Sequence, residues 1–320
     1  MGCPSSVRQY DFKALTDIWT GNAERRGDRL ITVGLLGSLR WWFEIVVRGL
    51  GGFACDPSDS DIRCPNKAGK RCVVCEFFGC TGWARKFRFQ VLDEKGQLKQ
   101  EAIREGELFK LQFIPLRPIS DEEWALLELT LLFISEYAAI GGKTVFKPSQ
   151  EETREKAFHH RDFGIIQIQS RPEVEKEYKE LKEYVAQERW RKADQSDFAW
   201  ASLRNFWCVK GRYLCRESQT ESTFNKVLGR FEYKNRAQEL EPSDCAAAWL
   251  AGGKQKSKKV FSFKAGGGRT FGFVKPGLID FTQMKERLKW AWENLQDNEF
   301  LTGRQILEHL LSGGTEKSGV

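Results

Sequence analysis

The sequence has very little histidine and methionine, and it has no long apolar run. Only 3 histidines and 2 methionines occur in 320 residues, so few side chains suit acid–base chemistry near neutral pH. No segment approaches the roughly 20 apolar residues needed to span a bilayer. The first residues, MGCPSSVRQYDF, lack the apolar core of a signal peptide. We therefore expect a cytoplasmic protein with no membrane partner, although Gly2 and Ser6 fit a lipidation pattern.

Two short segments look like nucleotide-binding motifs but lack the rest of each motif. Residues 141–144, Gly-Gly-Lys-Thr, match the end of a P-loop. Tyr137 stands where that motif needs its first glycine, and a helix is expected before the loop instead of a strand. Residues 162–164, Asp-Phe-Gly, match a kinase triplet, but the other kinase motifs are missing. The sequence therefore disfavours both nucleotide hydrolysis and kinase activity.

Basic residues exceed acidic ones. The chain has 51 Lys and Arg against 44 Asp and Glu, a formal charge of +7 and a pI near 8.9. A positive excess favours a polyanionic partner such as nucleic acid. With 41% hydrophobic residues, the chain is globular, and 320 residues are enough for two domains that each bury a core.

Cysteine is abundant, and its positions are clustered. Of the nine cysteines, five lie in an insertion at about 51–82 that has no clear periodicity, and a loop of that length needs something to hold it. A structural zinc site takes four thiolate or imidazole ligands, usually with one Cys-x-x-Cys pair. Cys72 and Cys75 form that pair, and Cys64 precedes them. The fourth ligand is Cys55 or Cys80, and we favour Cys55 because Cys80 directly follows an apolar Phe-Phe-Gly step.

The first half of the chain alternates strand and helix patterns in the order β-α-β-β-α-β. Ser120 and Glu123 form a capping box that begins the second helix. This order is typical of a ferredoxin-like domain. The expected strands cover 12–20, 83–92, 108–116 and 163–169, with a short edge strand at 30–33, and the expected helices cover 36–50 and about 120–138.

The second half is aromatic and glycine-rich, and its pattern is harder to interpret. A Glu/Lys-rich helix at 172–191 links it to the first half, and strands are expected at 260–264 and 271–275. The predicted fold class is α+β, with two ferredoxin-like (RRM-like) domains in tandem and a zinc-binding cysteine-rich insertion. The expected boundaries are 1–170 for the first domain, 171–195 for the linking helix and 196–320 for a second, divergent domain.

Three segments together resemble the RAMP superfamily of CRISPR proteins. Residues 34–42, GLLGSLRWW, are similar to the first helix of that superfamily. Residues 72–83, CVVCEFFGCTGW, are similar to its cysteine-plus-FG segment, and 141–164 to its glycine-rich loop and the strand that follows. The likeness is closest to the subunit family that caps the head of type III-B effector complexes.

The resemblance implies two ferredoxin-like domains, no catalysis, binding to CRISPR RNA near its 3′ end or to target RNA, and docking onto other RAMP subunits. The residues themselves agree with an RNA-binding role. Residues 37–38 are expected at a helix start that suits a phosphate, and basic residues alternate with Phe87 and Phe89 in the second strand, as on RNA-binding sheets. The second half has a further basic patch at 254–259. The candidate RNA-binding residues are Ser38, Arg40, Arg48, Arg85, Lys86, Arg88, Lys143, Lys147, Arg161 and Arg269.

The alternative to a binding subunit is a RAMP endoribonuclease that processes precursor CRISPR RNA. Such an enzyme activates a 2′-hydroxyl with a general base and stabilises the phosphorane with a cation. His159, His160 and Lys143 are the candidates for these roles. A weaker alternative is metal-dependent cleavage through Asp56, Asp59 or Asp61, which could equally be turn residues.

Overall fold

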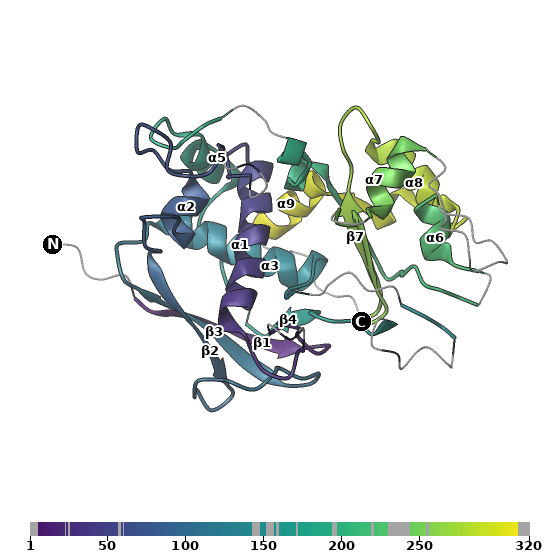
Figure 1. The fold of residues 1–320 in the computed structure, drawn as a ribbon, viewed down its shortest axis with the longest axis horizontal. Coiled ribbons are helices and arrows are strands. Elements are labelled where there is room, and N and C mark those ends of the chain that lie inside the picture. Colours follow the sequence, from purple (N-terminus) through teal and green to yellow (C-terminus); the bar gives the residue numbers. More distant parts are fainter. Residues whose placement is uncertain are drawn as a thin grey trace.

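The protein consists of two antiparallel sheets, several helices and long connecting loops (Figure 1). The computed structural model describes residues 6–22, 24, 26–56, 59, 61–142, 148–151, 157, 160–170, 172–193, 197–218, 221–229, 244–253 and 256–312. Within these residues, no helix is both long and apolar enough to cross a membrane.

The first sheet has the strand order β2-β3-β1-β4, and every neighbouring pair is antiparallel. With a helix in each crossover, this is the arrangement that the β-α-β-β-α-β order predicts. The short helix α2 lies in the insertion that precedes β2. The elements are β1 (Arg8–Ala14), α1 (Thr32–Gly49), α2 (Val73–Phe78), β2 (Phe87–Asp93), β3 (Leu108–Pro115), α3 (Asp121–Tyr137) and β4 (Ile166–Ile168).

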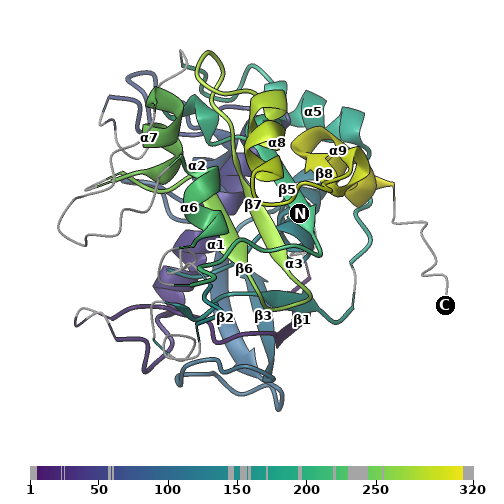
Figure 2. The same cartoon turned by 90° about the vertical axis from the view of Figure 1, so that its right-hand side faces the viewer.

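The second sheet repeats this order as β6-β7-β5-β8 and is also antiparallel. Figure 2 shows this half toward the viewer, with helices α6, α7 and α8 in front of the strands. The elements are α5 (Tyr178–Ala186), η2 (Asp197–Trp200), η3 (Leu203–Asn205), β5 (Phe206–Lys210), α6 (Thr223–Val227), α7 (Cys245–Ala251), β6 (Val260–Phe263), β7 (Arg269–Phe273), α8 (Phe281–Lys289), η4 (Asp297–Glu299), β8 (Phe300–Thr302) and α9 (Gly303–Leu311).

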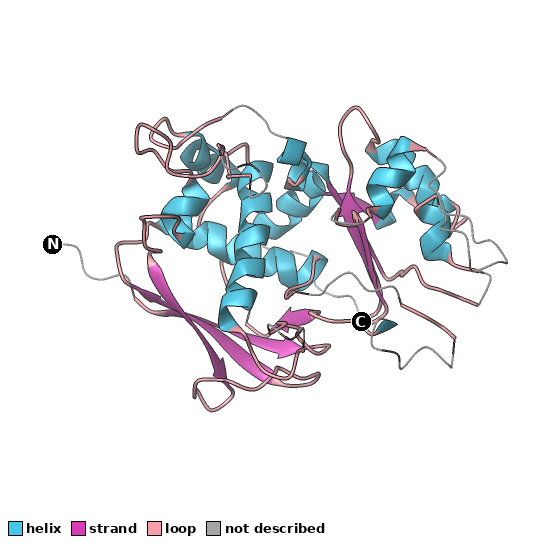
Figure 3. Ribbon diagram, viewed as in Figure 1, coloured by secondary structure: helices cyan, strands magenta, loops and turns pink. Residues whose placement is uncertain are grey.

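Helices α1 and α3 form a layer between the two sheets (Figures 1 and 3). On one side Phe43 of α1 lies against the insertion, where Phe77 stacks on it at 5.4 Å between ring centroids. On the other side Trp42 contacts Phe206 and Phe271 of the second sheet at 6.3 and 5.9 Å. One continuous core therefore joins the two halves of the chain.

The sequence of α3 explains its place in this layer. Its residues ALLELTLLFI are apolar on nearly every side, and a helix of that kind is buried all round. The structure buries α3 against β4, α1 and α9. The capping box predicted at its start is confirmed: the Ser120 side chain accepts the N–H of Glu123, whose carboxylate accepts the N–H of Ser120.

The first sheet is covered on one face only. Phe87 and Phe89 of β2 are buried against the helices, as the one-sided packing predicts, whereas Arg88 points to the exposed face. The exposed face is therefore largely polar apart from Leu108 and Ile114 of β3, and its described strand residues lack the aromatic rings that many RNA-binding sheets present. Its side chains include Gln9, Lys13, Arg88, Gln90, Lys110, Gln112 and Gln167.

Several expected boundaries were wrong. Helix α1 begins at Thr32, not at 36, so no edge strand forms at 30–33. Its N-cap, Ile31, makes no side-chain capping bond, which is why the start carried little sequence signal. Helix α5 covers only half of the expected linking helix at 172–191, and it packs on α3 and α9 through Leu181, Tyr184 and Val185.

One buried cation joins the second sheet to α3. Arg269 of β7 donates to the carbonyl oxygens of Ser135 at 2.9 Å, Ala138 at 2.5 Å and Ile134 at 3.4 Å. These carbonyls lie at the end of α3, where the last C=O groups lack partners within the helix and the dipole favours a cation. Burial lowers the pKa of Arg269 below its ordinary value.

We predict that Arg269→Met lowers the free energy of unfolding by about 2–4 kcal/mol, because the helix-end carbonyls lose a charged donor while remaining buried. Urea denaturation followed by circular dichroism measures this loss. The control is Arg304→Met, since Arg304 is exposed and pairs with Glu308 across one helical turn, and the loss of stability should stay within about 0.5 kcal/mol. Equal decreases in the free energy of unfolding for the two variants would contradict the role of Arg269.

Candidate metal centre and nucleic-acid interface

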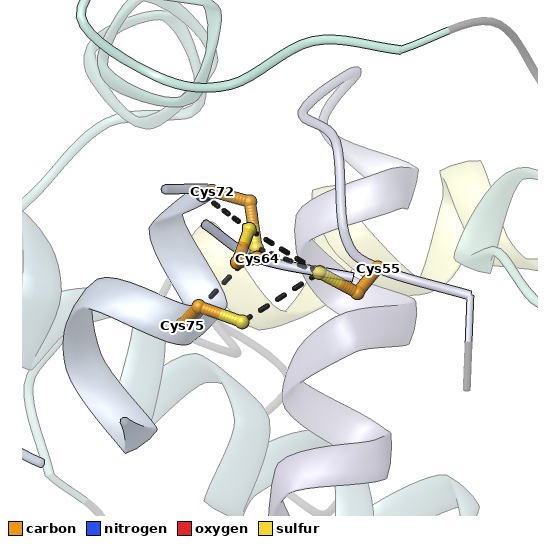
Figure 4. Close-up of side chains that lie close together, drawn as sticks. All are labelled: Cys55, Cys64, Cys72 and Cys75. Carbon is orange, nitrogen blue, oxygen red and sulfur yellow. Dashed lines mark hydrogen bonds between the residues drawn. The ribbon is translucent and has the colours of Figure 1, made fainter. Parts of the chain in front are cut away.

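Four cysteines come together in a cluster beside α1 (Figure 4). Cys55 follows the turn after α1, Cys64 lies further along the same loop, and Cys72 and Cys75 lie at the start of α2. Cys72 is the N-cap of α2, and its sulfur accepts the backbone N–H of Cys75 at 3.4 Å. The Cys-x-x-Cys spacing thus puts two sulfurs on one helical turn, facing the other two.

The sulfur positions suit a tetrahedral metal ion. The Cys55 sulfur lies 3.3 Å from that of Cys64, 3.9 Å from that of Cys72 and 3.6 Å from that of Cys75. All four sulfurs lie within 4.8 Å of one another, and all four residues are buried. Zinc bound at about 2.3 Å to four sulfurs requires separations of about 3.8 Å. The four cysteines could therefore hold a metal ion.

Two arginines approach the cluster from outside. Arg40 of α1 donates from Nη2 to the Cys75 sulfur at 3.2 Å, and Nη1 of Arg191 lies 3.9 Å from the Cys64 sulfur. Burial lowers the pKa of Arg40, but Cys75 and Glu44 beside it outweigh that effect and raise the pKa above its ordinary value. Both positive groups would offset the negative charge that four thiolates bring to a divalent ion.

Of the two candidates for the fourth ligand, the structure brings Cys55 into the cluster and leaves Cys80 outside it. Cys80 is half-buried and forms a short backbone bridge with Trp83. The physical reason is the Phe-Phe-Gly step: α2 ends at Phe78, and the chain turns at Gly79, whose φ is +85°. Cys80 follows this turn, and its sulfur is not part of the group of four.

The predicted phosphate site at a helix start was wrong. Gly37 and Ser38 lie in the second turn of α1, because the helix begins at Thr32, and their N–H groups are used within the helix. The Ser38 hydroxyl accepts the N–H of Gly141 at 3.0 Å. Arg40 is held by Glu44, Gly79 and Cys75, so both side chains serve local structure.

Three more of the candidate RNA-binding residues are engaged by the protein itself. Arg48 donates to the carbonyls of Ala201 and Cys55 and pairs with Glu44. Lys86 pairs with both carboxylate oxygens of Glu123 at 2.8 Å. Arg269 holds the end of α3, as described above. The partners of these three residues are distant in the sequence or lie on another helical turn. The pattern of charges in the sequence therefore suggests exposed side chains, whereas the structure half-buries Arg48 and Lys86 and buries Arg269.

The remaining candidates are more accessible. Arg88 is exposed on the open face of the first sheet, and the side chain of Arg161 is 50% exposed beside Asp17. Arg85 is half-buried, with its Nε donating to the Phe87 carbonyl at 3.0 Å. Lys143 and Lys147 lie outside the described residues.

Arg161 belongs to a pocket that the sequence analysis missed. The pocket has a volume of about 330 Å³ and is lined by Arg26, Arg104 and Arg161 together with Trp19 and two aspartates. Asp17 binds Arg104 at 3.1 Å and Arg161 at 3.6 Å. The three arginines come from segments more than 50 residues apart in the sequence, so no local pattern predicts that they meet, although Arg161 alone was a candidate. Cations beside an aromatic ring can bind a nucleotide.

The catalytic alternatives gain little support. Of the three candidates for the endoribonuclease, His159 and Lys143 lie outside the described residues. The third, His160, is half-buried, and its backbone N–H donates to the carbonyl of Ala157. The Asp59 carboxylate accepts the N–H of Asp61 at 2.8 Å, which is a turn contact. Asp56 is buried.

Comparison with known proteins supports the resemblance. Residues 11–146 match the family model described as RAMP superfamily. The match covers less than half of the chain, and this part of the chain is similar to that superfamily. The matched segment contains the first three strands, α1, α3 and the four cysteines.

No curated protein matches the sequence. Among solved structures, the apo crystal structure of Cmr1 from Pyrococcus furiosus aligns over 96% of each chain, with 10% identity and a TM-score of 0.44. A superposition this loose carries no function from that protein to this one.

We predict that the purified protein contains about one zinc ion per chain. The Cys72→Ser variant should lose the zinc ion, because only three sulfur ligands remain. The same substitution also changes the N-cap residue of α2. Cys80→Ser is the matched control and should retain the metal, since its sulfur lies outside the cluster. Elemental analysis by mass spectrometry measures both. A folded wild-type protein without metal would contradict the site.

Proposed function

We propose that this protein is a non-catalytic RNA-binding subunit of a type III-B CRISPR effector complex. The observation that carries the proposal is the RAMP superfamily match over 11–146, which includes α1, α3, β2, β3 and most of β1 but not β4 of the first sheet. In the proposed complex the protein caps the assembly near the 3′ end of the CRISPR RNA, helps to engage target RNA and docks onto other RAMP subunits.

The proposed RNA path uses the cations that remain accessible. Arg88 on the open sheet face and the pocket of Arg26, Arg104 and Arg161 contact phosphates. The open face adds glutamine side chains, which can donate to and accept from the 2′-hydroxyls and bases of RNA. The net charge of +7 attracts the strand over a longer range.

The proposed metal is a structural zinc ion held by Cys55, Cys64, Cys72 and Cys75. All-cysteine ligation is closed, so it leaves no position for a catalytic water. Its role is to hold the insertion at about 51–82 against α1. The metal therefore supports the fold beside the RNA surface and takes no part in chemistry.

We predict that Arg88→Ala and Arg161→Ala each weaken binding to single-stranded RNA and flatten its salt dependence by about 0.7 per lost phosphate contact. Fluorescence anisotropy over a salt series measures both effects. Arg304→Ala removes an exposed arginine from α9, far from this surface in the chain, and serves as the charge-matched control. If all three variants bind alike, the proposed path is wrong.

The endoribonuclease alternative is tested with CRISPR repeat RNA in the absence of divalent metal. We predict that the RNA remains intact when its fragments are separated on a denaturing gel. If the wild-type protein cleaves the RNA and His160→Ala does not, the protein is a processing endoribonuclease and the proposal of a non-catalytic subunit is wrong.

A further inference from the structure

A second pocket lies at the C-terminal end of α1, where the two halves of the chain meet. Its volume is about 410 Å³, which is within the range of small-molecule sites. The turn after α1, the η2–η3 segment and the turn at Lys275 and Pro276 form its walls. The pocket of Arg161 lies instead near Trp19, which contacts Gly141 beside the N-terminal half of α1. The two sites are therefore distinct.

The described residues that line this pocket carry positive charge and no negative charge. They include Arg48, Arg204 and Lys275. Arg48 is committed to Glu44, but Arg204 is exposed, and its guanidinium is fixed by one bond from Nε to the Gly49 carbonyl at 3.1 Å. Its Nη2 lies against the turn at Gly51. Planar guanidinium groups of this kind suit the oxygens of a phosphate.

A further cation lies against Trp200, which lines the pocket. The Lys259 side chain is buried, and its ammonium lies 4.7 Å from the ring centroid of Trp200 and 5.1 Å from that of Trp249. Burial, together with the charges of Lys275 and Lys256, lowers the pKa of Lys259 to about 8. No ion pair with a carboxylate neutralises Lys259 within the described part of the chain. Positive potential thus accumulates around Trp200.

The backbone is shaped for this arrangement. Gly51 has a φ of +96°, and a Cβ there would lie 2.7 Å from Nη2 of Arg204. Only glycine allows the guanidinium to lie against this turn. The Asn205 side chain donates to the carbonyls of Ala199 and Trp200, both at 3.3 Å, and so fixes the segment that carries the indole ring.

We propose that this pocket binds a nucleoside monophosphate unit, with its base against Trp200 and its phosphate between Arg204 and Lys275. Stacking on an aromatic ring accepts any base, and the cations account for the anionic group. The unit is a free nucleotide or the phosphorylated end of an RNA strand, because both present the same chemistry. The proposal goes beyond the RNA path, which uses Arg88 and Arg161.

The test is isothermal titration of the full-length protein with adenosine 5′-monophosphate and with a short single-stranded RNA that carries a 5′-phosphate. Arg204→Ala and Lys275→Ala should each weaken, at least tenfold, the binding of whichever of these two probes the wild-type protein binds. Arg304→Ala should leave it unchanged. Circular dichroism confirms that each variant is folded, and Arg204→Lys, which keeps the charge, should recover part of the affinity.

The two probes distinguish the sources. Binding of adenosine monophosphate, with loss in Arg204→Ala, assigns a free nucleotide. Binding of the phosphorylated RNA alone, with loss in Arg204→Ala and on removal of its 5′-phosphate, assigns an RNA end. The proposal is overturned if neither probe binds or if binding survives in both Arg204→Ala and Lys275→Ala. If RNA binding depends on Arg88 and Arg161 but not on Arg204, the proposed nucleotide site in the pocket is wrong, whereas the proposed RNA path remains supported.

Discussion

The burial of α1 and α3 between two sheets is the constraint on which the rest of this structure depends. Trp42 shows it most clearly: its ring contacts Phe133 of α3 and Phe206 and Phe271 of the second sheet, and its N–H donates to the Ala139 carbonyl at 2.8 Å. Separating the halves would expose this core to water. The two sheets therefore share one core, although each has the strand order of a separate ferredoxin-like fold.

The same helix positions every site. Arg40, in the middle of α1, donates to a sulfur of the metal cluster, and Ser38 holds the loop at Gly141. At the end of α1, Gly49 allows Leu203 to approach within 2.5 Å of where a Cβ would lie, and the neighbouring residues Arg48, Ser202 and Arg204 line the second pocket. A change in the packing of α1 would consequently affect the cysteine cluster and the pocket of Arg204 together.

The sequence predicted the features that depend on local pattern. The capping box at Ser120, the order of the first sheet and the four clustered cysteines need only spacing and composition. The second sheet was harder, because β5 buries Phe206 and Cys208 on one face and Trp207 and Val209 on the other, so no polar alternation marks the strand. The buried cations were missed for a related reason: carbonyl partners distant in the chain leave no sequence signal.

The central proposal is that this protein works on RNA as part of an assembly, and recovery of the tagged protein from its native cell tests it most directly. Sequencing of the copurified RNA and mass spectrometry of the copurified proteins should reveal short CRISPR RNAs and other RAMP subunits. Recovery of the protein alone, with neither RNA nor RAMP partners, would contradict the account.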